Sequence, residues 1–346
     1  MFFNLFFLLY LTNINSFIKT KSYDLSFKKS NCISIYCTNN KLKERIIDKS
    51  KNYLKLIRSE NIIPTLLLSF TGGWITNPSI YNLLSSKTFI TSTLITQFIM
   101  SSSMIMNDIY DFDIDKINNP KRPLISGKIS MKEAIFLNSI LLLLSEYLNI
   151  FFLPNYLHII VHLSIINITM YTPILKKILF IKNISCASLV TFSIFFASLS
   201  SITSITSTNK LIELNSNFKL LSILLKFIFY GSLYNELLLD ISDYDGDKIN
   251  NIKTIPVIFG KNIAWIFANI ILYINILFNT FSLSYLYNFD IGIILSFICF
   301  PTLFNLYKIK KKNYSKEIIK YTVFETNKTL FLSLLYFCSI VYVKLS

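Results

Sequence analysis

Residues 89–115 read FITSTLITQFIMSSSMIMNDIYDFDID, an apolar run of membrane-spanning length that ends in the acidic cluster Asn107-Asp108-Ile-Tyr-Asp111-Phe-Asp113-Ile-Asp115. A second cluster, Asp240-Ile-Ser-Asp243-Tyr-Asp245-Gly-Asp247, follows another apolar run far along the chain. Carboxylates at a membrane boundary are costly unless they are solvated, paired or bound to cations. The two clusters therefore indicate one cation site assembled from two helices.

The composition is typical of a polytopic membrane protein, with 53% hydrophobic residues and a mean hydropathy of +0.52. We expect an all-α fold of about nine transmembrane helices. The expected helices are 61–77, 89–107, 130–153, 155–172, 184–205, 219–239, 263–287, 290–307 and 328–345.

Lysine and arginine concentrate before the first expected helix and in the loops after the second, fourth, sixth and eighth. This alternation follows the positive-inside rule and places both acidic clusters on the same side of the membrane. The net charge of +15 is therefore interpreted as topological, and nucleic acid is not expected as a partner.

The N-terminal residues resemble a targeting leader. An apolar run at residues 2–11, too short to span, precedes a stretch rich in Lys, Ser and Asn that continues to about Lys51. We predict a leader over 1–54 and one membrane domain over 55–346, and expect a plastid membrane. The mitochondrial inner membrane and the endoplasmic reticulum are the alternatives, and a signal anchor or disordered tail would explain the same residues.

Helical spacing places the acids of each cluster along one helix face. Asn107, Asp111 and Asp115 recur at steps of four, and the second cluster uses steps of three and four. Oxygen ligands without His or Cys favour a hard cation, and Mg²⁺ usually completes its shell with water and phosphate. The expected metal ligands are Asn107, Asp108, Asp111, Asp115, Asp240, Asp243 and Asp247. One such cluster alone is more often a solvated loop, but two on one side favour a diphosphate site.

Basic residues near both clusters are candidates for binding that diphosphate. Arg122 lies between two prolines that stiffen its loop, and a guanidinium suits phosphate geometry. The full candidate set is Arg122, Lys121, Lys176 and Lys248. Each of them also serves as a topological charge, and Tyr171 has the common alternative role of an interfacial aromatic residue.

The motifs Asn107-Asp108-x-x-Asp111-x-x-x-Asp115 and Asp240-x-x-Asp243-x-x-x-Asp247 resemble the two signatures of the UbiA superfamily of intramembrane prenyltransferases. The resemblance extends from about residue 55 to the C-terminus. It implies a helical bundle around a central cavity and Mg²⁺-dependent transfer of a prenyl chain from a prenyl diphosphate to a hydrophobic or aromatic acceptor. We expect catalysis to involve Asp111, Asp115, Asp243 and Asp247. We also expect a catalytic role for Tyr171, whose ring would stabilise the allylic cation or whose hydroxyl would orient the phosphate.

The subfamily is indicated by residues 119–127 and 254–260. They resemble the branch that contains chlorophyll synthases, homogentisate prenyltransferases and geranylgeranylglyceryl phosphate prenyltransferases. Ile109 stands where chlorophyll synthases usually have Trp, and Asp108 stands where homogentisate enzymes often have Gln. The acceptor thus stays open among these three types, with a 4-hydroxybenzoate-type polyprenyltransferase as the alternative.

Two readings from other functional classes are disfavoured. An ion-coupled transporter would place its acids near the bilayer midplane on Gly- or Pro-interrupted helices, whereas these acids lie at helix ends and Gly is scarce. An inactive scaffold of the same fold would not need two intact sets of carboxylates.

Overall fold

The computed structural model describes residues 47–345, except 172–173, 203–209 and 251. The chain divides into two units, residues 1–50 and Lys51–Ser346, and only 47–50 of the first are described. The predicted leader therefore lies mostly outside the described residues. Residues 47–56 form one helix, which is followed by a short 3-10 turn, Ser59–Asn61.

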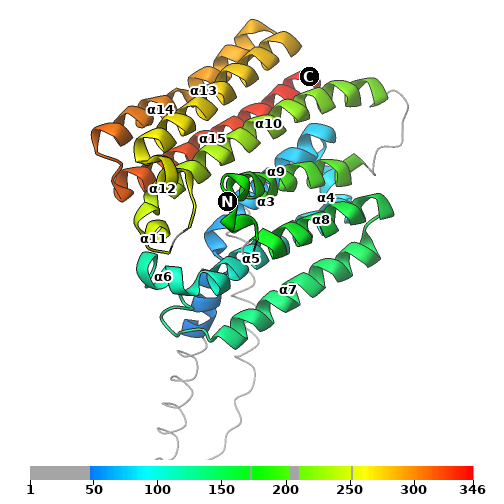
Figure 1. The fold of residues 1–346 in the computed structure, drawn as a ribbon. Helices are drawn as coiled ribbons and strands as arrows, with labels where there is room; N and C mark the ends of the chain where they lie inside the picture. The colour runs from blue at the N-terminus through cyan, green and yellow to red at the C-terminus, as the bar shows by residue number, and fades with distance from the viewer. Residues whose placement is uncertain (1–46, 172–173, 203–209, 251, 346) are drawn as a thin grey trace, which may run out of the picture. The chain divides into compact units, whose positions relative to one another are not determined.

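The described part of the second unit consists of helices joined by loops and turns (Figure 1). Its helices are α3 (Ile62–Thr76), α4 (Ile80–Ser85), α5 (Lys87–Tyr110), α6 (Phe112–Asn118), α7 (Met131–Phe152), α8 (Asn155–Tyr171), α9 (Ile181–Ile202), α10 (Lys210–Ser242), α11 (Tyr244–Ile249), α12 (Ile255–Phe259), α13 (Lys261–Leu286), α14 (Phe289–Lys311) and α15 (Lys316–Leu345). The all-α prediction is confirmed.

Each of the nine predicted segments coincides with one long helix, although the boundaries differ. Within the described residues, seven helices are long and apolar enough to cross a membrane by length and composition. Helices α3 and α8, with 15 and 17 residues, fall short of that length. Helix α15 begins at Lys316 rather than at residue 328, because its first turns are too polar to register as an apolar segment.

Local sequence explains where the long helices begin. Ser86 caps α5 by accepting a hydrogen bond from the Phe89 amide, and Ser130 forms a capping box with Glu133 at the start of α7. Helix α7 buries only Ala134, Ser145 and Asn149 and turns its many apolar side chains outward. In water this would be unfavourable, whereas lipid would cover such a face.

The long helices of the second unit pack against one another, and this packing positions the helices that carry the acidic motifs. Helix α10 packs against α9, α13 and α15, while α3 packs against α9 and α5 packs against α7 (Figure 1). A small residue allows α3 and α9 to approach closely, since a Cβ on Gly72 of α3 would lie 2.2 Å from the Ile194 carbonyl oxygen of α9. Buried hydroxyls join helices nearby, as Ser92 and Ser200 lie 2.7 Å apart.

Candidate active site

The first acidic motif spans a break between two helices. Helix α5 ends at Tyr110 and α6 begins at Phe112, with Asp111 at the junction. The backbone keeps its helical register through the break: the Asp111 amide donates to the Asn107 carbonyl at 2.9 Å and the Asp115 amide to the Asp111 carbonyl at 2.8 Å. Asn107, Asp111 and Asp115 therefore share one face, as their spacing predicted.

The second motif repeats this arrangement at the end of α10. The Asp243 amide donates to the Leu239 carbonyl at 2.9 Å, and the Asp247 amide of α11 donates to the Asp243 carbonyl at 3.0 Å. The short helices α6 and α11 contact each other, so the two motifs lie together in space. Off the shared faces, the side chains of Asp113 and Asp245 are exposed.

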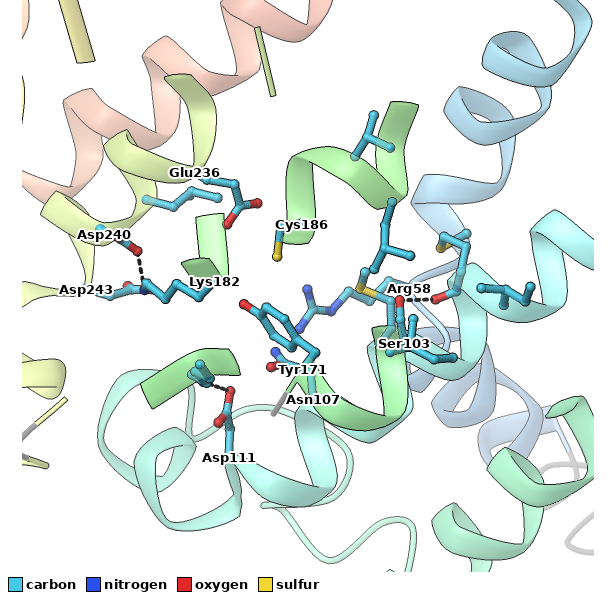
Figure 2. A pocket seen from close by; sticks show the side chains of 18 of the residues that line it. Arg58, Ser103, Asn107, Asp111, Tyr171, Lys182, Cys186, Glu236, Asp240 and Asp243 are labelled. Atoms are coloured by element: carbon cyan, nitrogen blue, oxygen red, sulfur yellow. Dashed lines mark hydrogen bonds and ion pairs between the residues drawn. The ribbon is translucent and has the colours of Figure 1, made fainter. Parts of the chain in front are cut away.

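Both motifs line one cavity of about 440 Å³ (Figure 2). This volume falls in the range of pockets that enclose small-molecule ligands, roughly 300–1,000 Å³. One part of the lining is acidic and basic. Another part is apolar and comes from α3, α5, α8 and α9: Leu68, Ile99, Met100, Ile168, Leu189, Val190 and Phe192.

Lysine side chains neutralise two of the buried motif carboxylates, Asp111 and Asp240. Lys176 pairs with Asp111, and Lys182 Nζ lies 2.5 Å from an Asp240 oxygen. The Asn183 amide also donates to Asp240, at 2.9 Å. Each buried carboxylate in these pairs has a cation beside it, as its desolvation requires.

Arg122 joins two carboxylates of the first motif. It donates to Asp108 at 2.9 Å and also pairs with Asp115. Arg58, in the left-handed backbone region at φ 50°, donates to the same Asp108 oxygen at 3.1 Å. Asp108 is 2% exposed and does not line the cavity, so it anchors the two arginines that do.

The oxygen ligands of the two motifs suit Mg²⁺, and water and phosphate would fill the remaining positions of its coordination shell. Within the described residues, no group of three or more His, Cys, Asp or Glu forms a ready-made metal site. Among the described residues, the ion-pair partner of Asp243 is Lys316, at a distance of 3.6 Å. Burial raises the pKa of Asp247 to about 6, against the opposing charge of Lys182 and with Asp240 and Asp243 adding to the rise. Asp243 and Asp247 are thus less fully neutralised than Asp111 and Asp240. Oxygen-only ligands with open positions fit an ion that keeps water and phosphate.

The structure brings most of the predicted site residues together. The predicted residues that line the cavity are Asn107, Asp111, Asp115, Arg122, Tyr171, Lys176, Asp240, Asp243 and Asp247. Asp108, a predicted metal ligand, does not line the cavity and instead accepts hydrogen bonds from Arg58 and Arg122. Lys121 and Lys248 do not line it either: both side chains are exposed, and Lys248 lies over the Tyr244 ring at 5.6 Å. Their predicted contact with diphosphate is not favoured by this geometry.

Four charged residues that line the cavity are absent from the prediction: Arg58, Lys182, Glu236 and Lys320. Arg58 and Lys182 stand at helix boundaries, where a topological charge explains them equally well. Glu236 carried a usable signal, since it is an acid inside an apolar run and lies four residues before Asp240.

Comparison with known proteins identifies the family. Residues 63–335 match the UbiA prenyltransferase family. The digeranylgeranylglyceryl phosphate synthase of Saccharolobus solfataricus is 32% identical over 259 residues, which cover 73% of this chain and 85% of that protein. The enzyme of the same name from Methanosphaera stadtmanae is 32% identical over 246 residues, covering 68% and 81%.

Solved structures show the same fold. A UbiA homologue from Archaeoglobus fulgidus, bound to DMAPP and Mg²⁺, superposes with a TM-score of 0.60 at 20% identity and covers 84% of this chain and 99% of its own. A digeranylgeranylglyceryl phosphate synthase structure gives 0.58 at 24% identity, covering 84% and 98%. This chain is an integral membrane protein with a transferase activity towards prenyl groups, and it belongs to the UbiA prenyltransferase family.

Proposed function

We propose that this protein transfers a geranylgeranyl chain from its diphosphate, with Mg²⁺, to the free hydroxyl of a geranylgeranylglyceryl phosphate lipid. The observation that carries the proposal is the single cavity, which joins two carboxylate motifs and their cations to an apolar compartment. The choice of acceptor is supported by the relatives that are 32% identical and act as digeranylgeranylglyceryl phosphate synthases.

The polar part of the cavity would bind the diphosphate. Asn107, Asp111, Asp115, Asp243 and Asp247 would hold Mg²⁺, which supplies positive charge to the leaving diphosphate. Once that charge is present, the lysines are no longer needed to neutralise the acids.

Three cations would then meet phosphate oxygens. Lys176, Lys182 and Arg122 line the cavity and now pair with acids of the two motifs. Cations fixed around the diphosphate stabilise the charge that develops on it as the allylic C–O bond breaks. The guanidinium of Arg122 would contribute two donors in one plane.

The apolar part would hold the prenyl chain and exclude water. Its side chains offer no hydrogen bond to a water molecule, so the allylic cation is protected from hydrolysis. The Tyr171 side chain points into the cavity between the two motifs, in the position for its ring to face that cation (Figure 2).

The test is prenyl transfer by purified protein in nanodiscs with labelled geranylgeranyl diphosphate and four acceptors: geranylgeranylglyceryl phosphate, homogentisate, chlorophyllide and 4-hydroxybenzoate. We expect product with the glyceryl phosphate lipid alone, lost in EDTA and recovered with added Mg²⁺. Product with an aromatic acceptor instead would overturn the choice of acceptor while leaving the reaction type intact.

We also propose a plastid membrane as the location, on the basis of the leader-like composition of residues 1–51. A fluorescent fusion of these residues should enter plastids. Delivery to mitochondria or retention in the endoplasmic reticulum would contradict this location.

A further inference from the structure

Glu236 is an acidic side chain that the mechanism above leaves without a role. It lies in α10, one turn before Asp240, within a helix of membrane-spanning length and composition. The side chain lines the cavity and is directed towards it (Figure 2). An acid inside a spanning helix is costly, so a functional role is the first explanation to test.

The surroundings of Glu236 leave its carboxylate available to a ligand. Lys182, whose charge acts on Glu236, forms its ion pair with Asp240 at 2.5 Å, and Asn183 donates to Asp240 as well. The Cys186 thiol on α9 is within hydrogen-bonding reach of Glu236, and the charges of Asp240 and Arg58 also act on this carboxylate.

Position separates Glu236 from the diphosphate-binding residues. The motif residues Asp240, Asp243 and Asp247 continue along α10 and α11 away from it. Towards the cavity, Glu236 faces Cys186 and Tyr171, whose side chains contact each other (Figure 2). A carboxylate here is one helical turn from the ligands of the leaving group, beside the ring expected to face the allylic carbon.

The proposed reaction requires a base at this point. As the donor C–O bond breaks, its electron pair leaves with the diphosphate, and the acceptor hydroxyl oxygen forms the new ether bond to the allylic carbon. The hydroxyl proton must then move to another group. We propose that Glu236 is the catalytic base that takes this proton, an inference that rests on the proposed acceptor being an alcohol.

Substitution of Glu236 by Gln tests the proposal, because Gln keeps the size of the side chain but cannot accept the proton. General-base catalysis is worth about 100-fold or more in rate, so Glu236→Gln should lower the turnover of ether formation by at least that factor. Mg²⁺-dependent binding of a non-hydrolysable geranylgeranyl thiodiphosphate should remain at the wild-type Kd. Glu236→Ala should regain turnover, saturably, when formate supplies a small carboxylate.

Glu325→Gln is the matched control. Glu325 is also an acid in a spanning helix, but it pairs with Lys328 at 2.7 Å and does not line the cavity. Its substitution should leave turnover unchanged.

Three outcomes would overturn the role of Glu236. Wild-type turnover in Glu236→Gln would mean that the leaving diphosphate takes the proton. A loss of donor binding in parallel with turnover would make Glu236 structural, and so would a Glu236→Ala variant that binds donor but ignores formate. If the wild-type protein itself fails to modify the glyceryl phosphate lipid, the proposed function fails first and the base role falls with it.

Discussion

Substitution of Asp240 and Asp243 by Asn, one at a time, should separate a residue that contributes to both stability and activity from one that contributes mainly to activity. Asp240 is 5% exposed and holds Lys182 in a buried pair at 2.5 Å. The side chain of Asp243 is 43% exposed, and its partner Lys316 is 3.6 Å away and 40% exposed. Both acids line the cavity, so both substitutions should impair transfer.

Their effects on stability should differ because of burial. Removing one partner of a buried ion pair costs about 3–5 kcal/mol, whereas an exposed pair contributes about 0–1 kcal/mol. At roughly 2–4 °C per kcal/mol for a domain of this general size, Asp240→Asn should lower Tm by about 10 °C and Asp243→Asn by only a few degrees.

The loss of transfer should nevertheless be large for Asp243→Asn. Removing one preorganised electrostatic group from a transition state typically costs about 100-fold to 1,000-fold in turnover. Thermal melts in detergent and turnover in nanodiscs measure the two quantities separately. Near-normal turnover in Asp243→Asn, or a fall in Tm as large as that of Asp240→Asn, would refute the reasoning.

Other positions give further expectations. Gly72→Ala should destabilise the protein by about 1–3 kcal/mol, since the added Cβ would lie 2.2 Å from the Ile194 carbonyl oxygen. Gly231→Ala is the control in the same thermal melt, because the atom nearest to its added Cβ would be 3.6 Å away. Arg122→Lys should weaken donor binding in a titration, because an ammonium lacks the planar pair of donors with which a guanidinium holds two phosphate oxygens. An unchanged Kd would argue against a bidentate contact of Arg122 with the diphosphate. Asp113→Ala should leave turnover unchanged, as the Asp113 side chain is 84% exposed and pairs with the surface lysine Lys116.

The architecture could be predicted from the sequence because apolar segments of spanning length are long and separated by charged loops. The errors lie at helix ends. Helix α10 begins at Lys210 and α15 at Lys316, both well before their apolar segments. The first turns of these helices are polar and are held by backbone hydrogen bonds, which a hydropathy pattern does not detect.

The acidic half of the site was equally predictable, since the spacing of the aspartates survives the helix breaks at Asp111 and Asp243. The choice among basic residues was not. Lys248 and Lys182 both belong to the loops that are rich in basic residues. The Lys248 side chain is exposed, whereas Lys182 pairs with Asp240 in the cavity. That distinction depends on how α9 rotates against α10, which is a property of tertiary packing.

The central claim is that the two motifs form one site, and a double-mutant cycle on Asp111 and Asp243 tests it most directly. The measurement is Mg²⁺-dependent binding of geranylgeranyl thiodiphosphate to the wild-type protein, to Asp111→Asn, to Asp243→Asn and to the double variant. If both acids act on one metal-bound diphosphate, each single substitution should remove most of the binding, and the double variant should lose little more. Losses that multiply as for independent sites, or a single variant that keeps wild-type affinity, would contradict the claim.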